Sequence, residues 1–333
     1  MPSLKPNDPT TLFIAILLIL AAVWLLQMNA AQFNPVPPKD VSFLAESGGN
    51  HPAAPELVGI AGYLNVNDGF KLADVKGNVI LVDFWTYSCI NCQRTTPYLN
   101  AWHEKYYDKG LAIVGVHSPE FAFEKEFANV QKAVNQFGIK YPVVLDNDFA
   151  TWRAYQNRYW PHKFLVDAQG RIRFDHIGEG GYAETESWIQ KLLMERDASL
   201  ALDKGMAAAA INPGVDFTQI GTPEIYLGYK FARAPLGNKE GFDPEHIVSY
   251  AVVSPAEPGT LQLPALQPNL AYLEGKWFNG AEASRLESET GRVLLRYKAK
   301  NVNIVAGGNA RLEVFVDGVP RQTLDVEGKR FTP

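Results

Sequence analysis

The chain has 333 residues, of which 47% are hydrophobic and 20% are charged, and its formal net charge is -5. These values are typical of a globular protein, and the length allows two domains and a tail. The acidic balance and the lack of a Lys/Arg run exclude a nucleic-acid-binding protein, because such proteins need concentrated basic charge.

The N-terminus carries one unbroken apolar run, residues 12–26, which continues less cleanly to residue 31. With its flanks, the run approaches the ~20 residues of a membrane-spanning helix. A cleaved signal peptide is the alternative, but Asn29 stands where the cleavage pattern prefers a small residue. We expect residues 1–31 to be an uncleaved, single-pass anchor in the inner membrane, with the rest of the chain on the periplasmic side. If the segment is cleaved, we expect a secreted protein.

Residues 32–58 are rich in Pro, Gly and small polar residues and are predicted to be a linker. The next segment, 59–195, alternates short apolar runs, typical of buried strands, with stretches of helical spacing. A turn sequence at 167–170 predicts a hairpin near its end. This alternation predicts an α/β fold with helices flanking a mixed sheet. Strands are expected at 79–82, 111–116, 141–145, 163–166 and 171–175, and helices at 96–107, 121–137 and 187–193.

Beyond an Ala-rich join at 195–222, apolar and polar residues alternate along short segments. This pattern predicts an all-β sandwich over residues 223–333. The sequence ends where another strand is expected, so we expect a truncated version of that domain. The alternating segments are 225–229, 292–305 and 312–316, the last followed by Asp317-Gly318 at a turn position.

The chain contains only two cysteines, Cys89 and Cys92, separated by two residues. A disulfide between them closes too short a loop to stabilise the fold. A structural zinc site needs four ligands, and no second cysteine pair exists. A c-type haem site needs His directly after the second cysteine, where Gln93 stands. We therefore expect no metal and no cofactor, and we interpret the pair as a redox-active Cys-x-x-Cys.

The cysteine pair follows a predicted buried strand and precedes a predicted helix. Free backbone N–H groups and the positive end of the helix dipole favour a thiolate at such a place. Cys89 is predicted to be the exposed attacking thiolate. Cys92, one turn into the helix, is predicted to be shielded and to resolve the mixed disulfide.

Two further residues are predicted to belong to the same site. Asp83 lies inside an apolar strand, so burial is expected to raise its pKa and make it a proton acceptor for Cys92. The alternative is an Asp at a strand end that reaches solvent. Pro161, if its peptide bond is cis, brings backbone beside the sulfurs and leaves an edge to hold a substrate chain. The alternative is a proline that merely starts a strand.

Four other residues are candidates for a substrate groove near the cysteines. His117 and Glu120 follow the second central strand, at an end of the sheet where sites of α/β proteins gather. Trp85 and Trp160 flank the motif residues Asp83 and Pro161 in the sequence. The alternative for His117 and Glu120 is that they are ordinary surface polar residues.

The stretch LVDFWTYSCINC resembles the active-site strand and helix start of thioredoxin. The segments GVHSPEFAFEKE (115–126) and YWPHKFLVDAQGRI (159–172) extend the resemblance to TlpA-like, membrane-anchored proteins. The chain is most similar to the exported portion of DipZ-type proteins, in which a thioredoxin-like domain precedes a β-sandwich. The matching positions in the first stretch are Asp83, Phe84, Trp85, Cys89 and Cys92.

The resemblance implies specific roles for four residues. Cys89 is the nucleophile, Cys92 the resolving thiol, Pro161 the cis-proline and Asp83 the buried acid. The dipeptide Ile90-Asn91 departs from the usual Gly-Pro, and Ser88 from the usual Trp. Because the residues between the cysteines help to set the redox potential, the direction of electron flow stays open.

The family likeness predicts a membrane-tethered, extracytoplasmic thiol–disulfide oxidoreductase. Its expected substrates are exported cysteine-containing proteins, whose disulfides it reduces, with a role in cytochrome c maturation as one option. The polytopic domain of DipZ is absent from the sequence, so a separate membrane electron donor of the CcdA or DsbD type is expected. The alternatives are a disulfide oxidase or isomerase using the same pair, or a carbohydrate- or protein-binding module with a vestigial redox domain.

Overall fold

The computed structural model describes residues 51–202, 207, 221–251, 266–299, 302–326 and 331–332. The predicted anchor, residues 1–31, and the first part of the predicted linker lie outside these ranges. Within the described ranges, no helix is both long enough and apolar enough to cross a membrane. The chain divides into two compact units, and each is described by itself.

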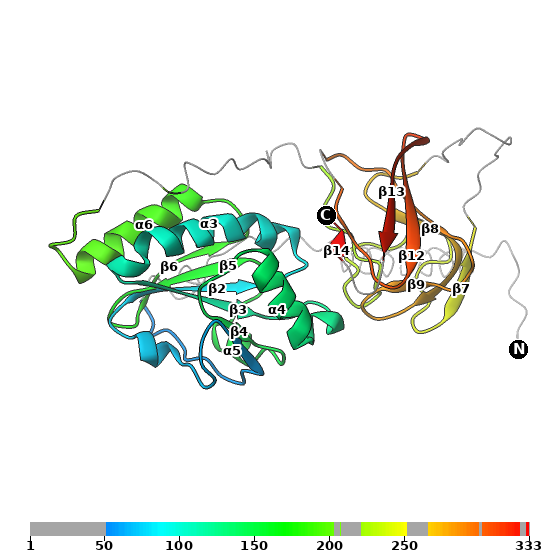
Figure 1. The fold of residues 1–333 in the computed structure, drawn as a ribbon. Coiled ribbons are helices and arrows are strands. Elements are labelled where there is room, and N and C mark those ends of the chain that lie inside the picture. Colours follow the sequence, from blue (N-terminus) through cyan, green and yellow to red (C-terminus); the bar gives the residue numbers. More distant parts are fainter. Residues whose placement is uncertain are drawn as a thin grey trace, which may run out of the picture. The chain divides into compact units, whose positions relative to one another are not determined.

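Six strands form one mixed sheet in the unit that contains the cysteines (Figure 1): β1 Gly62–Leu64, β2 Val79–Trp85, β3 Leu111–His117, β4 Val143–Leu145, β5 His162–Val166 and β6 Ile172–Ile177. Their spatial order is β1-β4-β3-β2-β5-β6. β2, β3 and β4 run parallel, whereas β1, β5 and β6 pair antiparallel with their neighbours. The predicted α/β fold around a mixed sheet is confirmed.

A hydrophobic core lies on each face of this sheet, because successive strand residues point to opposite faces. The first core packs the sheet against α3 (Ile90–Tyr106), α4 (Phe127–Gln136) and α6 (Tyr182–Arg196). The second core, on the other face, includes Trp152 of the short helix α5 (Ala150–Ala154). On β2, the residues Val79, Leu81 and Trp85 belong to the first core, and Ile80, Val82 and Phe84 to the second.

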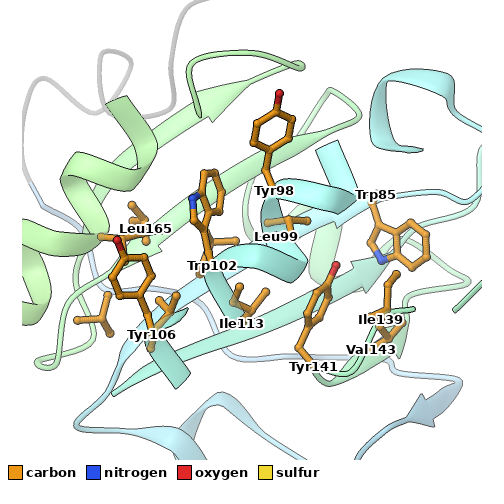
Figure 2. Packing of buried hydrophobic residues seen from close by; sticks show 14 of the residues in the cluster. Trp85, Tyr98, Leu99, Trp102, Tyr106, Ile113, Ile139, Tyr141, Val143 and Leu165 are labelled. Atoms are coloured by element: carbon orange, nitrogen blue, oxygen red, sulfur yellow. The ribbon is translucent and has the colours of Figure 1, made fainter. Parts of the chain in front are cut away.

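Helix α3 is fixed to the sheet by large aromatic side chains. Figure 2 shows Tyr98, Trp102 and Tyr106 following one another along the helix. Trp102 and Tyr106 are completely buried. Burying a side chain of this size contributes about 3 kcal/mol. The start of α3, where the cysteines lie, is therefore held in a defined position at the end of β2.

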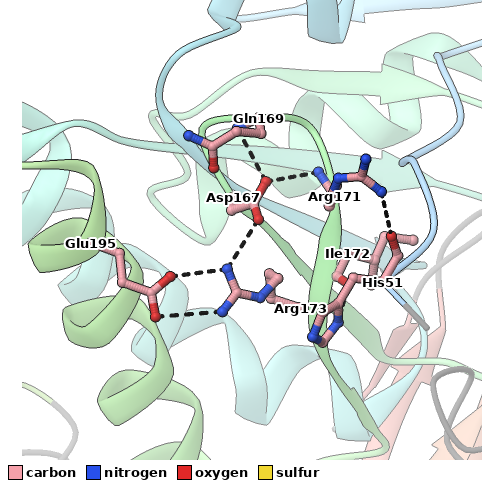
Figure 3. A network of polar contacts seen from close by, with 7 residues as sticks. All are labelled: His51, Asp167, Gln169, Arg171, Ile172, Arg173 and Glu195. Atoms are coloured by element: carbon pink, nitrogen blue, oxygen red, sulfur yellow. Dashed lines mark hydrogen bonds and ion pairs between the residues drawn. The ribbon is translucent and has the colours of Figure 1, made fainter. Parts of the chain in front are cut away.

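Asp167 organises the hairpin between β5 and β6 (Figure 3). Its Oδ1 accepts the backbone N–H of Arg171 at 2.9 Å, and Arg173 donates to its Oδ2 at 3.1 Å. Arg173 also pairs with Glu195 of α6 at 2.9 Å, which ties the hairpin to the helix. The predicted turn at 167–170 is confirmed.

Residues 121–137 and 51–58 are among the segments of this unit that differ from the prediction. The predicted helix at 121–137 is interrupted, since a 3-10 turn at Ala122–Lys125 precedes α4 and Glu126 between them has extended backbone. Residues 51–58, expected in the linker, pack against the unit, where Leu57 is buried. The interruption matters for the site, because the 3-10 turn carries a buried carboxylate to the cysteines.

The second unit is β-rich, as predicted. Its longest strand, β8 (Ala271–Asn279), pairs antiparallel with β7 (Ile247–Tyr250), β9 (Ser284–Leu286) and β10 (Arg292–Leu295). The prediction missed β7, β8 and β9. The strand predicted at 225–229 is wrong, because these residues form turns and irregular backbone.

Two more antiparallel pairs complete the C-terminal region. One of them is a hairpin that turns at Asp317 and Gly318, both with positive φ (51° and 76°), as the turn prediction required. The strands are β11 Ile304–Val305 with β14 Phe331–Thr332, and β12 Ala310–Val316 with β13 Val319–Val326.

Candidate active site

Cys89 and Cys92 lie at the start of α3. Cys89 is the residue before the first helical turn, with extended backbone, and its carbonyl accepts the N–H of Gln93 at 3.0 Å. Both cysteines are free thiols, and Cys89 is partly exposed whereas Cys92 is only 2% exposed. A substrate can therefore reach the sulfur of Cys89 beside the free N–H groups of the helix, while the sulfur of Cys92 is shielded.

The surroundings of Cys92 disfavour its thiolate. Burial raises the pKa of Cys92 well above its ordinary value, and the hydrogen bond and charge of Cys89 and the charge of Asp83 add to this effect. A backbone hydrogen bond to Thr86 acts in the opposite direction. Cys92 therefore stays protonated until a base removes its proton.

Asp83 is a candidate for this base. It lies in the middle of β2, is only 2% exposed, and its Oδ1 has no hydrogen-bond partner among the described residues. The alternative of an Asp that reaches solvent does not apply. Burial raises its pKa from 3.8 to about 7, although the charge of Lys163 lowers it. A carboxyl group with this pKa can accept and release a proton near neutral pH.

Lys163 was not predicted from the sequence as part of the site. It stands directly opposite Asp83 in the antiparallel pair β2–β5, is completely buried, and donates from Nζ to the carbonyl of Gly178 at 2.9 Å. Burial lowers its pKa to about 8, against the raising effect of Asp83. Its only sequence signal is a lysine inside an apolar strand, HKFLV, and the strand pairing needed to place it is not encoded locally.

Pro161 immediately precedes β5, and the Trp160–Pro161 peptide bond is cis. The carbonyl of Pro161 accepts the N–H of Gly178 at 2.8 Å, so the loop after β6 is held against this residue. The indole of Trp160 is partly exposed and donates to the carbonyl of Ser118 at 2.9 Å. These contacts connect the proline to the loops after β3 and β6.

His117 ends β3 and is completely buried, so it does not line an exposed groove. Its Nε2 lies 3.3 Å from the backbone N of Tyr87 and 3.4 Å from Oγ1 of Thr86, in the loop before Cys89. Burial lowers the pKa of His117 to about 3, so the ring is neutral at physiological pH. The contacts of His117 hold the loop before Cys89 in place. The buried, neutral ring does not exchange protons with solvent.

Glu124 is a second residue that the sequence analysis missed. Its carboxylate is buried and accepts from Oγ of Ser88 at 2.5 Å, and from the backbone N–H groups of Glu120 and Phe121 at 2.6 and 2.9 Å. Burial raises its pKa, although these hydrogen bonds favour the charged form. Glu124 thus joins the 3-10 turn at 122–125 to the residue before Cys89. No periodicity in GVHSPEFAFEKE distinguishes it from Glu120 or Glu126.

The four predicted groove residues divide into two groups. Trp85 and His117 are buried inside the unit, whereas Trp160 and Glu120 are partly exposed. The backbone of Glu120 bonds to Glu124 and places it next to the loop of the cysteines. A substrate chain that approaches Cys89 can contact only the second group.

The arrangement can perform thiol–disulfide exchange. An accessible thiol at a helix N-terminus can attack a disulfide, and a shielded thiol beside a buried carboxylate can close the cycle. Cys89 and Cys92 lie at the start of α3, and Asp83 and Lys163 stand opposite each other on β2 and β5, with Lys163 two residues after Pro161.

Family models and curated relatives agree with this chemistry. Residues 60–175 match the AhpC/TSA family, and residues 222–332 match the thioredoxin-like C-terminal domain. The protein DipZ of Mycobacterium tuberculosis is 38% identical over 284 residues, which are 84% of this chain and 38% of DipZ. The chain therefore spans well under half the length of that relative.

A second relative is matched over most of its own length. The thiol-disulfide oxidoreductase ResA of Bacillus anthracis is 32% identical over 122 residues, which are 37% of this chain and 68% of ResA. A putative thiol:disulfide interchange protein DsbE from Chlorobium tepidum, whose structure is solved, is 27% identical, with a TM-score of 0.37, over 44% of this chain and 96% of its own. The assignment follows from the sequence matches, among which DipZ is a similar protein covered only in part: the chain belongs to the thioredoxin-like thiol–disulfide oxidoreductases of the ResA type.

Proposed function

We propose that this oxidoreductase reduces disulfide bonds of exported cysteine-containing proteins from the outer side of the cytoplasmic membrane. The observation that carries the proposal is the asymmetry of the cysteine pair, with Cys89 accessible and Cys92 buried beside Asp83. Maturation of c-type cytochromes is one process that needs such a reductant.

The proposed cycle has two steps. The Cys89 thiolate attacks a substrate disulfide, forms a mixed disulfide and displaces one substrate thiolate, which takes up a proton. Cys92 then gives its proton to Asp83 and attacks the sulfur of Cys89, which releases the second substrate thiolate. Two electrons pass from the enzyme to the substrate, and a Cys89–Cys92 disulfide remains.

The raised pKa of Cys92 is compatible with the reducing direction. A strongly oxidising pair is one whose reduced form is stabilised, commonly through a stabilised thiolate. Burial and the charge of Asp83 act against a thiolate at Cys92, so the second thiol gives the reduced form no such stabilisation. The names of the ResA and DipZ relatives are compatible with either direction of electron flow.

Three further parts of the proposal concern the rest of the chain. We propose that residues 1–31 anchor the protein in the membrane, that residues 223–333 form one β-sandwich, and that a separate membrane protein of the CcdA or DsbD type re-reduces the cysteines. The anchor is supported by the apolar run at 12–26. Protease accessibility of the full chain in intact cells tests the location.

A trapping experiment tests the reaction. In the full chain, Cys92→Ala leaves the attacking thiol without its resolving partner, so we expect mixed disulfides between Cys89 and exported proteins. The double variant Cys89→Ala/Cys92→Ala is the matched control and should trap none. Equal recovery from both variants contradicts the proposed attack by Cys89.

The direction is tested by redox equilibrium of the wild-type chain with glutathione or dithiothreitol buffers. A reduction potential near that of thioredoxin, about -270 mV, supports the reductase. A potential near about -120 mV identifies an oxidase instead.

A further inference from the structure

A row of four residues crosses the sheet behind the cysteines. The pairing of β3, β2, β5 and β6 places Gly115, Asp83, Lys163 and His176 side by side. Asp83 and Lys163 point to the same face as Leu81 and Leu165, two positions away on their strands, and these leucines belong to the core that also contains Cys92. Asp83 and Lys163 therefore lie on the Cys92 side of the sheet.

Of the residues in this row, Lys163 is the one that can carry a positive charge beside Asp83 at neutral pH. Gly115 has no side chain, and a Cβ there would come within 2.9 Å of Nε1 of Trp85. Burial and the charge of Lys163 lower the pKa of His176 to about 4, so this ring is neutral at physiological pH. Directly opposite residues of an antiparallel pair have Cβ atoms about 5 Å apart.

The other charged or titratable groups around the pair are accounted for. On the Asp83 side these are Cys92 of α3 and Tyr141 before β4, and burial raises the pKa of both well above the ordinary values. On the Lys163 side, Glu179 forms an ion pair with Arg94 at 3.2 Å. The ring of Tyr182 of α6 lies 5.9 Å from Nζ of Lys163, and burial raises its pKa too.

Lys163 is held in place without being neutralised by contact. Its Nζ donates to the carbonyl of Gly178, and the part of the chain that the structure describes has no carboxylate within 4.0 Å of Nζ. Asp83, likewise, has an Oδ1 atom with no hydrogen-bond partner among these residues. The charges of the two groups thus act on each other through space, from the neighbouring strands β2 and β5. Asp83 and Lys163 do not form a direct salt bridge.

We propose that Lys163 is a positioning residue of the reaction, a buried counter-charge that keeps Asp83 ionised so that Asp83 can take the proton of Cys92. The inference rests on the proposed two-step cycle and adds a residue to its second step. The proton moves from Sγ of Cys92 to the Asp83 carboxylate, and Lys163 keeps its own protons throughout. Without the ammonium group, the buried carboxyl stays protonated at neutral pH and cannot accept another proton.

The test is the pH dependence of the second step in Lys163→Gln, measured as release of a preformed Cys89 mixed disulfide in a single turnover. A nearby opposite charge shifts a pKa by about one to three units, so the midpoint of the rate profile should rise by at least about one pH unit. Release should then be at least about fivefold slower than in the wild type at the wild-type midpoint, and should recover at higher pH. An unchanged midpoint in a folded Lys163→Gln protein overturns the proposal.

Two controls separate charge from structure. His176→Gln changes the other neighbour of Lys163 in the row and should leave the midpoint unchanged. In an Asp83→Asn background, Lys163→Gln should produce no further change in the profile. A shift of the same size in that background contradicts an effect through Asp83.

A direct titration keeps the test decisive if Lys163→Gln does not fold. NMR titration of the wild-type chain and of Asp83→Asn follows the Lys163 ammonium group itself, and loss of the carboxylate should lower its pKa further. An unchanged Lys163 titration overturns the proposal. This measurement needs no turnover, so its failure is distinguishable from failure of the proposed function, which shows as an absence of trapping by Cys92→Ala.

Discussion

Two buried acid–base pairs lie on opposite faces of strand β5, and their basic members, His162 and Lys163, are consecutive residues. Lys163 stands opposite Asp83 on the Cys92 side, whereas His162 contacts Asp175 on the other side at 3.0 Å. The second pair is closed, because Nδ1 of His162 also bonds to Oδ1 of Asn157 at 2.7 Å. The first pair is open, since Oδ1 of Asp83 has no hydrogen-bond partner among the described residues.

The difference separates a structural pair from a reactive one. An amide oxygen can only accept, so His162 donates from Nδ1 to Oδ1 of Asn157, which also accepts the backbone N–H groups of Arg158 and Tyr159. One proton then bridges His162 and Asp175, and it has no free partner to move to. Asp83 has an unused acceptor atom and a pKa near neutrality. Satisfied hydrogen bonds make the one pair rigid, and an unsatisfied oxygen leaves the other available for chemistry.

Asp83→Asn gives the largest expected effect and is the most direct way to break this comparison. Loss of a positioned general base slows a proton-transfer step by about 10²- to 10⁴-fold. We expect a decrease of this size in release of the mixed disulfide at neutral pH, measured by stopped-flow mixing. Asp175→Asn, which changes the closed pair, should leave the shape of the pH profile unaltered. Equal slowing by both variants would show that the two pairs do not differ in function.

Stability as a function of pH sharpens the comparison. The pKa of Asp83 is about 7 in the folded chain and 3.8 in its ordinary state, so the folded state binds this proton more tightly. The free energy of unfolding should therefore fall as the pH rises from about 4 to about 7, by up to about 4 kcal/mol from this group. Denaturant titrations of wild type and Asp83→Asn should differ by this slope, which is absent in the variant. Parallel curves for the two proteins contradict the raised pKa.

Asp175→Ala tests the closed pair. It removes one partner from a buried, hydrogen-bonded pair and leaves His162 without its acceptor. We expect a loss of about 3 kcal/mol in the free energy of unfolding, measured in urea, with the chemical step preserved in the protein that remains folded. A loss in activity without a loss in stability would assign the pair to catalysis instead.

Glu124→Gln extends the comparison to a third buried acid. Its carboxylate is saturated with donors, like the closed pair, so we expect a structural effect. The neutral amide is a weaker hydrogen-bond acceptor than the carboxylate that it replaces. The expected loss in the free energy of unfolding is about 2 kcal/mol. The fluorescence of the indoles or hydrogen exchange of residues 86–89 reports loosening of the loop. A rate decrease with a shifted pH midpoint and no loosening would place Glu124 in proton transfer.

The parts of the site that the sequence could predict are those encoded within a few residues. The spacing of Cys89 and Cys92, the Asp inside an apolar run and the proline before a strand are all local patterns. The position of Cys92 one turn inside a helix was predicted, but helical spacing was recognised only from residue 96, whereas α3 begins at Ile90 and tolerates Pro97 in its interior. Burial of the helix against the sheet outweighs the local preference against proline.

Lys163 and Glu124 could not be predicted because their roles depend on contacts between distant segments. Lys163 meets Asp83 only through the register of β2 and β5, which are separated by α3, β3, α4, β4 and α5. Glu124 reaches Ser88 across 36 positions of the chain. In the C-terminal region, β8 carries Gly275 and Lys276 in its middle, and this break in alternation hides a nine-residue strand.

The consecutive placement of His162 and Lys163 has a consequence for how this family can vary. Side chains of a strand change face at every residue, so insertion of one residue between Pro161 and His162 exchanges the two faces. The lysine would then enter the apolar core around Phe84 and Phe164, and the imidazole would take its place beside Asp83. Substitutions can alter either pair by itself, but a change in length at this point disrupts both at once. We therefore expect homologues to conserve the spacing here more strictly than the residues.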